Sequence, residues 1–376
     1  MLCICMWCRY CHSGVLQTPK ILFSRKEKVM AKYDVNIDLA NETKKEMAQI
    51  LNDEDKHILN KVGAFASLYD ISLSGYRDPV LVLKTEEPGS KQMIAMKYDK
   101  IENVCYDMIN HLINDCIVMG AKPLTVQDAI ICGKMDKKIV TRIVKAIAET
   151  CKTNGCALTG GETSEQPGVL SDDTYILTSS IVGIVEKEHI IDGSKIKNGD
   201  VVLSLESSGV HTNGYTLVRR IMKENPEILN EKIGEHSFID TILTPHRCYY
   251  NDLKGLFGKN LIHGLAHITG GGIRENLNRI LPDDLDAKID LSKYQVLEIF
   301  KLLKDYGKID DNEMVRTFNL GVGMALVTSE DKKSAVMDYL EEKGLNCYEI
   351  GVICEGNKQV ICQGKIDWRC CYYDMQ

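Results

Sequence analysis

The sequence predicts an α/β protein made of two domains. The first observation is the order of its elements, in which apolar strands run into glycine-rich loops and these loops run into amphipathic helices. The second is the length of 376 residues, which suits two domains that each bury a core. The third is a turn-rich stretch at 192–200, which separates two blocks of this kind. We expect an N-terminal domain at 30–186, a C-terminal domain at 187–357 and a tail at 358–376.

The N-terminal half mixes helices and strands. Its patterns predict a helix at 41–62, a strand at 79–83, a buried helix at 102–119, a helix at 137–153 and a strand at 175–185. The helix at 137–153 has the clearest signal, because Ile139, Ile143 and Ile147 recur every four residues and Gly155 supplies a stop. A short strand before Thr159 is expected to run into a loop at Thr159–Thr163.

The C-terminal half repeats one plan twice. A strand at 201–205 leads through a loop at 207–214 into a helix at 215–223. A second strand, at 264–268, leads through the glycine run 269–272 into a helix at 273–280. The repeated order of strand, glycine loop and helix is typical of α/β architecture.

Charge and composition exclude several classes of protein. Lys and Arg total 46 against 53 Asp and Glu, a net charge of −7, so no general basic field exists to hold a nucleic acid or an anionic membrane. No run approaches the roughly 18 consecutive apolar residues of a membrane span. Most of the 15 cysteines, such as Cys105, Cys116 and Cys151, lie in apolar patterns, as buried thiols do in a reducing compartment. We therefore expect a cytoplasmic protein.

The first 29 residues differ from the rest. They hold four cysteines between Cys3 and Cys11, followed by His12, a string that could bind zinc or an iron–sulfur cluster. Their positive charges follow the short apolar start instead of preceding it, which argues against a secretory signal. A further interpretation is that translation starts at Met30. We expect residues 1–29 to be an extension outside the two domains.

A polar stripe interrupts the buried helix at 102–119. Asp107, Asn114 and Asp115 are seven and eight residues apart, so they lie on one face of the helix. Acids on an otherwise apolar helix need a cation or hydrogen-bond donors, and hard oxygen ligands suit Mg²⁺ with phosphate oxygens. The alternative is a carboxylate stripe that faces water.

Three glycine-bearing segments carry hydroxyls and acids. They are Thr159–Glu165, Ser207–Gly214 and Thr269–Gly272, and the last two come just before a helix N-terminus. Glycine lets backbone N–H groups approach a phosphate, although a simple turn with an N-cap explains any one loop alone. The sequence has no P-loop string and no serine-hydrolase elbow, and His211 and His267 lack the spacing of zinc ligands.

Taken together, these motifs resemble those of the aminoimidazole ribonucleotide synthetase family, also called phosphoribosylformylglycinamidine cyclo-ligase. The likeness runs in order from Val62 to Ile353. The segments that carry it are Asn114-Asp115 with Gly120–Leu124, Gly160–Gly168, Ser208–Tyr215, Ala266–Gly272 and Glu313–Met324.

The resemblance implies a two-domain ATP-binding synthetase fold, with an N-terminal mixed sheet that pairs in a homodimer. It implies ring closure of a ribonucleotide with ATP and Mg²⁺. The expected ATP-side residues are Lys32, Glu86, Gly89, Ser90, Lys91, Asp107, Asn114, Asp115, Gly160, Gly161, Glu162 and Thr163, with Asp115, Asp107 and Glu162 as metal ligands. The expected substrate-side residues are Ser208, Gly209, His211, Thr212, Asn213, Thr269, Gly270, Gly271, Arg316 and Asn319, with Asp115, His211 and Asn213 as catalytic groups.

The segment Thr85–Lys91 departs from the family pattern Thr-Asp-Gly-Val-Gly-Thr-Lys. Glu86 keeps a carboxylate that is one methylene longer, whereas Glu87 replaces a glycine and adds a negative charge. If that glycine needed a positive φ, the change would cost roughly 1–2 kcal/mol. Lys32 is only an approximate counterpart of the family lysine. Two alternatives therefore stay open: another kinase or synthetase of the same superfamily, and a non-catalytic paralogue that binds a nucleotide.

Overall fold

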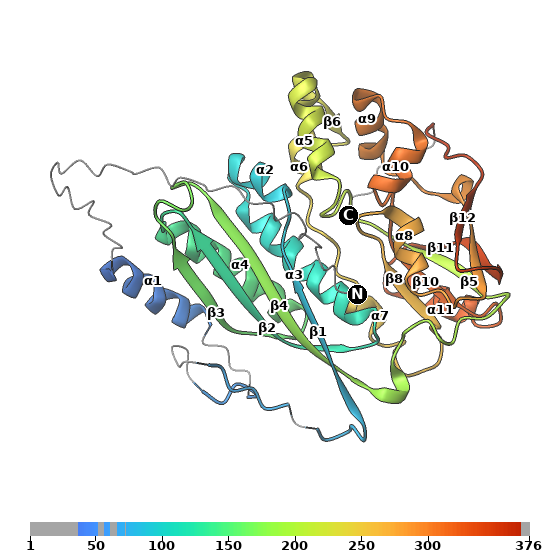
Figure 1. The fold of residues 1–376 in the computed structure, drawn as a ribbon, viewed down its shortest axis with the longest axis horizontal. Coiled ribbons are helices and arrows are strands. Elements are labelled where there is room, and N and C mark those ends of the chain that lie inside the picture. The colour runs from blue at the N-terminus through green and yellow to red at the C-terminus, as the bar shows by residue number, and fades with distance from the viewer. Residues whose placement is uncertain (1–36, 52–55, 61–65, 72, 370–376) are drawn as a thin grey trace, which may run out of the picture. The chain divides into compact units, whose positions relative to one another are not determined.

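Two β-sheets, one in each half of the chain, organise the computed structural model of this protein (Figure 1). The structure describes residues 37–51, 56–60, 66–71 and 73–369, and these belong to one compact unit, Asn36–Gln376. The predictions for residues 1–29 and for Lys32 lie outside the described residues.

The first sheet has four strands in the order β1-β4-β2-β3. Strand β4 runs antiparallel to both β1 and β2, and β2 pairs in parallel with β3. The strands are β1 (Pro79–Glu86), β2 (Lys122–Cys132), β3 (Ala157–Glu165) and β4 (Tyr175–Glu186). The predicted strands at 79–83 and 175–185 are thus confirmed, and β1 continues three residues further than expected.

Helices lie along one face of this sheet, where Figure 1 shows α3 and α4 side by side. The helices of this half are α1 (Ile37–Ile50), α2 (Lys91–Lys97), α3 (Ile101–Ile117) and α4 (Lys137–Thr153). Helix α4 has the predicted bounds; the Asp136 side chain caps its first turn, and Gly155 follows it with a φ of 68°.

The first predicted helix, at 41–62, is wrong for the part of its second half that the structure describes, residues 56–60. Helix α1 ends at Ile50, and Ile58 instead forms an isolated bridge with Tyr69. Leu59, which lies in the second half of that predicted helix, is 63% exposed. None of the residues 56–60 is fully buried, so this part of the chain has no packed apolar face of the kind that stabilises a helix.

The predicted loop at Thr159–Thr163 is also wrong, because these residues are part of strand β3. The register against β2 shifts between Val126 and Gln127, and Gly160 takes a φ of 139° at this bulge. Gly161 is needed for a different reason: a Cβ there would lie 2.2 Å from the carbonyl oxygen of Asp128. The paired glycines therefore permit a bulge and a close strand contact.

The second sheet has six strands in the order β12-β9-β11-β5-β10-β8, antiparallel except for the β12–β9 pair. The strands are β5 (Val201–Glu206), β8 (Gly264–His267), β9 (Leu285–Asp290), β10 (Val322–Thr328), β11 (Cys347–Glu355) and β12 (Val360–Gln363). Strand β12 lies in the stretch 358–376 that was predicted as a tail, so part of that stretch belongs to the sheet. The predicted boundary near 187 falls between the two sheets.

Seven helices are described in this half: α5 (Tyr215–Glu224), α6 (Phe238–Ile242), α7 (Tyr250–Leu253), α8 (Gly272–Asn278), α9 (Glu298–Gly307), α10 (Asp311–Thr317) and α11 (Lys333–Glu342). Short 3₁₀ segments lie at Lys187–His189, Pro226–Asn230 and Leu291–Lys293, and strands β6 (Lys232–Ile233) and β7 (His236–Ser237) form a small hairpin. The predicted order of strand, loop and helix is confirmed by β5 with α5 and by β8 with α8.

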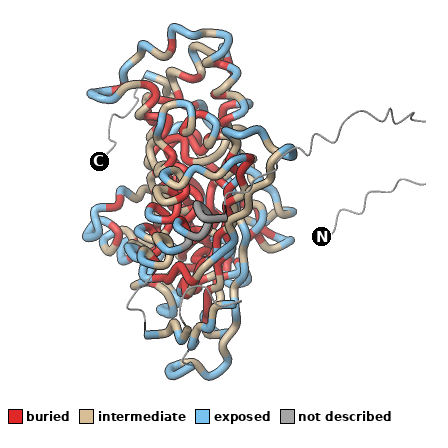
Figure 2. Tube along the Cα trace, turned by 90° about the vertical axis from the view of Figure 1, so that its left-hand side faces the viewer, coloured by how far each residue is buried: buried red, intermediate tan, exposed pale blue. Residues whose placement is uncertain are grey.

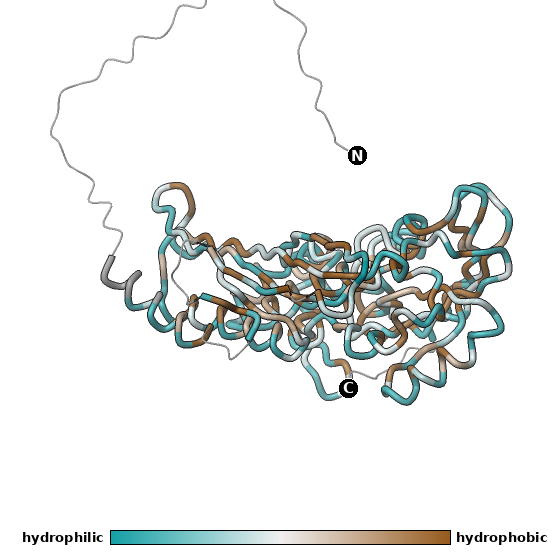
Figure 3. The backbone as a smooth tube through the Cα atoms, turned by 90° about the horizontal axis from the view of Figure 1, so that it is seen from below, coloured by the Kyte–Doolittle hydropathy of each residue, from teal (hydrophilic) through white to brown (hydrophobic). Residues whose placement is uncertain are grey.

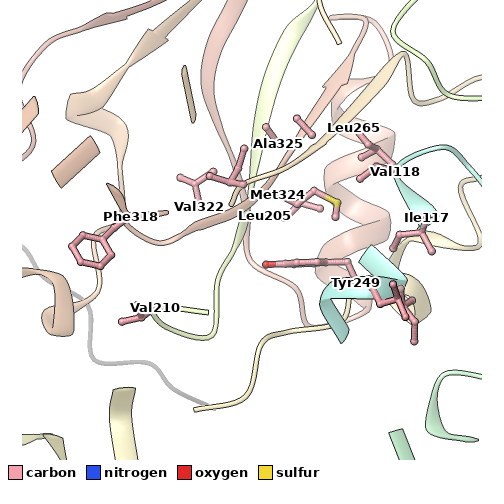
Figure 4. Close-up of a cluster of buried hydrophobic side chains, with 14 of the residues drawn as sticks. Ile117, Val118, Leu205, Val210, Tyr249, Leu265, Phe318, Val322, Met324 and Ala325 are labelled. Carbon is pink, nitrogen blue, oxygen red and sulfur yellow. The ribbon is translucent and has the colours of Figure 1, made fainter. Parts of the chain in front are cut away.

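One hydrophobic core joins the two halves. Buried segments run through the middle of the fold in Figure 2, and Figure 3 shows hydrophobic and hydrophilic stretches alternating along the chain. In Figure 4 the end of α3, at Ile117 and Val118, lies near Tyr249 and near Leu205 and Met324 of the second sheet. All of these side chains are under 9% exposed, so the halves share buried surface.

No helix among the described residues is both long enough and apolar enough to cross a membrane. The nine cysteines in the described part of the chain are all free thiols.

Candidate active site

The polar stripe of α3 holds an irregular segment of the second half, Leu243–Tyr249. The side-chain amides of Asn103, Asn110 and Asn114 donate to the carbonyls of Leu243 (2.8 Å), His246 (2.6 Å) and Arg247 (2.8 Å). In return, Asp107 Oδ1 accepts from the N–H of His246 (2.7 Å) and Asn114 Oδ1 from that of Tyr249 (3.0 Å). Backbone groups thus satisfy Asn114 and one oxygen of Asp107, and we assign Asn114 to positioning instead of nucleotide binding.

Lys91 and Asp107 form a fully buried ion pair. Lys91 Nζ lies 2.8 Å from Asp107 Oδ2 and donates to the carbonyls of His211 (3.0 Å) and Thr244 (2.9 Å). Burial raises the pKa of Asp107 to about 6, against the lowering effect of Lys91. Burial also lowers the pKa of Lys91, and Asp107 opposes that shift. Both side chains are 0% exposed and engage protein groups, which leaves neither open to a nucleotide or a metal.

Asp115 lies beyond this pair, at the end of α3, where it meets the end of β8. Its Oδ1 is 2.7 Å from Nδ1 of His267, and its Oδ2 is 3.6 Å from Nε2 of His111, one helical turn earlier. Asp115 is 19% exposed, whereas His267 and His111 are almost fully buried. An acid thus orients one imidazole and lies beside another at the junction of the two halves.

A cation bridges Asp115 to the end of β1. Lys84 Nζ lies 2.9 Å from Asp115 Oδ2 and 3.1 Å from Glu86 Oε2. Burial alone would raise the pKa of Asp115, but the hydrogen bonds from His267 and Lys84 lower it below its usual range. Asp115 therefore stays ionised, and Glu86 is the carboxylate that faces it.

Four histidines gather around this group: His111, His211, His246 and His267. The rings of His211 and His246 stack at 3.8 Å, and His246 Nε2 lies 2.9 Å from His267 Nε2. Burial lowers the pKa of His111 to about 4, and it lowers the pKa values of His211 and His246 well below normal. These three imidazoles are therefore neutral at pH 7.

The loop 207–214 is fixed from several sides. Asn319 accepts from the Ser207 hydroxyl (2.9 Å) and donates to the carbonyl of Gly209 (2.9 Å), so its amide group holds the loop, and its contact with substrate stays a prediction. The Ser208 hydroxyl donates to the carbonyl of Pro245 (2.7 Å). His211 has a φ of 61° and its Nε2 accepts from the N–H of Ser208, while its buried Nδ1 has no partner among the described residues.

The second glycine loop lies against the first. A Cβ on Gly270 would be 3.3 Å from Asn213 Oδ1, which places these two predicted residues side by side. Asn276 holds the loop through the carbonyls of Thr269, Gly270 and Gly272. Gly271 precedes α8 with a φ of 92°, a left-handed conformation that favours glycine.

Helix α10 completes the substrate side. Gly272 packs on the carbonyl of Val315, and Gly214 packs on the ring of Phe318, because added Cβ atoms would lie 1.9 Å and 2.4 Å from them. Arg316, between these contacts, is exposed. Thr212, Asn213 and Thr269 are half-buried and Gly270 is exposed, so these four predicted substrate-side residues are accessible, whereas His211 and Asn319 are buried.

The ATP-side prediction is only partly reflected in the structure. Gly89, with a φ of 63°, and Ser90 form the turn between β1 and α2, and a Cβ on Gly89 would lie 3.9 Å from the carbonyl of Thr212. Glu87 is exposed and has no positive φ, so its replacement of a glycine costs no backbone strain.

Glu162 does not reach Asp115. Glu86 of β1 pairs with Ser179 of β4, Ser179 pairs with Asp128 of β2, and Asp128 pairs with Gly161 of β3. Two strands, β4 and β2, therefore separate Glu86 from β3. Glu162 is one residue further along β3, is exposed, and by strand alternation points to the face without α3. Its neighbours Gly160 and Thr163 also belong to this edge strand. The proposed metal set of Asp115, Asp107 and Glu162 is therefore not brought together.

Sequence reasoning did not name Lys84, His111, His246 or His267 as site residues. The signal for His111 was available, because it lies four residues before Asp115 on the same face of a predicted helix. Lys84 lies two residues before Glu86 on one strand face. Nothing in the local pattern around His246 marked it.

Comparison with known proteins matches both halves of the chain. The models of the N-terminal and C-terminal domains of AIR synthase related proteins match residues 68–185 and 197–363. The chain is 39% identical over 312 residues to a phosphoribosylformylglycinamidine cyclo-ligase of Bacillus mycoides, covering 82% of this chain and 90% of the relative. It is 42% identical over 311 residues to the enzyme of that name from Streptococcus pneumoniae, with coverage of 82% and 90%.

Solved structures show the same fold at low identity. A thiamine-monophosphate kinase from Stenotrophomonas maltophilia has a TM-score of 0.60 at 16% identity, covering 89% of this chain and 98% of the kinase. The hydrogenase maturation protein HypE in complex with ATP has a TM-score of 0.60 at 15% identity, with coverage of 85% and 89%. Since two domain models and relatives near 40% identity span most of its length, this chain belongs to the AIR synthase related family.

Proposed function

We propose that this protein is a phosphoribosylformylglycinamidine cyclo-ligase, which uses ATP to close formylglycinamidine ribonucleotide to aminoimidazole ribonucleotide in purine biosynthesis. The observation that carries the proposal is the convergence of Asp115 from the first half with His267 and the loop 207–214 from the second. Relatives with this name match both halves at about 40% identity. The chain is accordingly an enzyme.

The reaction needs two reactants in one place and a means to neutralise phosphate charge. The formamide oxygen takes the γ-phosphoryl group of ATP and ADP leaves. The neighbouring nitrogen then attacks the same carbon, the C–O bond breaks and inorganic phosphate departs. The protein contributes positioning and electrostatic stabilisation, for which glycine loops, Mg²⁺ and basic groups are better suited than a nucleophilic side chain.

The ribonucleotide is assigned to the cluster of loops 207–214 and 269–272. Backbone N–H groups before α5 and α8 suit a phosphate, and the exposed Arg316 on α10 adds a positive charge beside them. His211 supports this assignment, because its buried Nδ1 is a hydrogen-bonding atom without a partner among the described residues. Asp115 orients His267 through Nδ1 and so fixes which ring nitrogen can take part in proton transfer.

ATP is assigned to the neighbouring turn at Gly89 and Ser90, beside Thr212. A solved structure of HypE, which has the same fold, is a complex with ATP, and this is consistent with a nucleotide ligand here. Glu86 and Asp115 already share one cation, the Lys84 ammonium, so this pair fits Mg²⁺ once Lys84 moves away, whereas Asp107 does not fit. Mg²⁺ held there would neutralise phosphate charge.

A homodimer through the first sheet is part of the proposal. The face of this sheet opposite α3 exposes Leu81 (52%), Leu83 (70%) and Ile176 (41%), three large apolar side chains on neighbouring strands. Exposed apolar patches of this kind mark protein contacts. Light scattering should give the mass of a dimer for the wild type and of a monomer for Leu83→Lys; a wild-type monomer contradicts this assembly.

The cytoplasm is the proposed location, since the described thiols are free. The alternative of a non-catalytic paralogue rests on the replacement of a family glycine by Glu87. Because Glu87 is exposed and has no positive φ, this replacement gives no structural reason to expect loss of activity.

Complementation of a purine auxotroph that lacks the cyclo-ligase tests the function. The wild-type chain should restore growth without purines, whereas Asp115→Asn should not. Asp173→Asn, an exposed acid on the loop before β4, serves as the matched control and should restore growth. Failure of the soluble wild-type chain to restore growth would contradict the proposal.

A further inference from the structure

We propose that His111, Asp115 and His267 bind a transition-metal dication, such as Zn²⁺ or Co²⁺, in a site whose chemistry differs from that of magnesium. Among the described residues, these three side chains each offer a ligand atom, and the atoms lie within 4.8 Å of one another. Imidazole nitrogens with a carboxylate are the ligands that zinc takes, while Mg²⁺ prefers oxygen alone.

The spacing is close to what a tetrahedral ion needs. His111 and Asp115 lie one turn apart on α3, with Nε2 and Oδ2 separated by 3.6 Å. Bonds of 2.0–2.1 Å in a tetrahedron put neighbouring ligand atoms roughly 3.4 Å apart. His267 Nδ1 is nearer, at 2.7 Å from Asp115 Oδ1, because a hydrogen bond joins them now. An ion would replace the proton of that bond and separate the two atoms slightly.

Hydrogen-bond partners on the second ring nitrogen orient the imidazoles of His111 and His267. Nδ1 of His111 lies 2.9 Å from the Thr212 hydroxyl, and a proton on Nδ1 leaves the lone pair of Nε2 facing Asp115. His267 offers Nδ1 when its proton resides on Nε2, where His246 Nε2 accepts it at 2.9 Å. Metal-binding histidines in proteins have such a partner on the other ring nitrogen.

Glu86 can add a ligand to the site, whereas Lys84 competes with the ion. Glu86 Oε2 lies 3.7 Å from His111 Nε2 and can serve as a fourth ligand. Lys84 Nζ now occupies the cation position between Glu86 and Asp115. Lys84 is 37% exposed and can swing out, which gives an ion a path to the carboxylates. The lysine is therefore a built-in competitor that weakens metal binding.

Occupancy would also remove Asp115 from its hydrogen bond with His267. An enzyme that carries the ion should therefore be inactive, a consequence that rests on the proposed function. Binding of the metal alone does not depend on that function, so the two proposals can fail separately.

The test is a titration of the full chain with Co²⁺, followed by visible absorption and equilibrium dialysis. His111→Asn keeps an amide nitrogen for the Thr212 contact and lacks Nε2. His189→Asn, on a half-exposed histidine outside the cluster, is the matched control. All three proteins contain the same cysteines, so the difference spectrum isolates the histidine site. The wild type and the control should bind one more equivalent of Co²⁺ than His111→Asn, with d–d absorption that the latter lacks.

Lys84→Met supplies a second and independent arm. Removal of the competing ammonium should tighten Co²⁺ binding by at least tenfold, the order expected for changes next to a metal site. The proposal is overturned if His111→Asn binds as much Co²⁺ as the wild type, or if Lys84→Met binds it more weakly. Should His111→Asn fail to fold, as judged by circular dichroism, the Lys84→Met arm alone decides.

Discussion

Replacement of Asp107 by Asn should show that the Lys91–Asp107 pair holds the two halves together. Asparagine keeps an oxygen for the N–H of His246 but leaves the Lys91 ammonium, which is 0% exposed, without a countercharge. Breaking one partner of such a buried pair costs about 3–5 kcal/mol. With an unfolding entropy of about 2.1 cal/mol/K per residue, that loss lowers the melting temperature of a unit of this size by about 4–7 °C.

Differential scanning calorimetry of a double-mutant cycle measures this coupling. Lys91→Met combined with Asp107→Asn removes both charges, so the double variant should be more stable than Asp107→Asn alone. If Lys91 and Asp107 acted only by contacting a bound nucleotide, their replacement would not change the stability of the ligand-free protein, and the double variant would show no recovery. A loss below about 1 kcal/mol for Asp107→Asn, or strictly additive effects, would refute the structural role of the pair.

Three further predictions concern other parts of the structure. Gly161→Ala should lower the free energy of unfolding by about 1–3 kcal/mol in urea titrations, because its Cβ would lie 2.2 Å from the Asp128 carbonyl oxygen. The control Gly155→Ala has open space around its Cβ and should cost only about 1 kcal/mol, from its positive φ. Glu87→Gly should leave the KM for ATP within a few-fold of the wild type, because Glu87 is exposed; a large loss would make it a metal ligand. Burial lowers the pKa of His111 from 6.5 to about 4, so between these pH values the unfolded chain binds a proton that the folded chain does not. The free energy of unfolding should therefore fall as pH drops from 6.5 to 4, by about 3 kcal/mol from this residue. His111→Asn should flatten that pH dependence, and an unchanged slope would contradict the lowered pKa of His111.

Local pattern was enough for much of the fold. Periodic isoleucines and a terminal glycine located α4 to the residue, and glycines before a helix located the turns at Gly214 and Gly271. Where glycines lie inside a strand, the sequence pattern predicted the wrong structure. Gly160 and Gly161 look like a loop, yet one permits a bulge and the other a close strand contact.

The site was predictable only in part, because its partners are far apart in the chain. The stripe of Asp107 and Asn114 was visible as a polar face, but its donors are backbone groups more than 130 residues away. No periodicity reports such a long-range contact. Asp115 was predicted through its motif, whereas His267 was not predicted as a site residue, and the hydrogen bond between them emerged only from the fold.

The most direct test of the account is product formation by the purified chain. Formylglycinamidine ribonucleotide, ATP and Mg²⁺ are incubated with the wild type and with Asp115→Asn, and aminoimidazole ribonucleotide and ADP are quantified together. The wild type should release one ADP for each ring closed, and Asp115→Asn, folded by circular dichroism, should form neither product at a measurable rate. Wild-type protein that closes no ring, or Asp115→Asn that closes it at the wild-type rate, would contradict the claim that the junction around Asp115 and His267 is the active site of a cyclo-ligase.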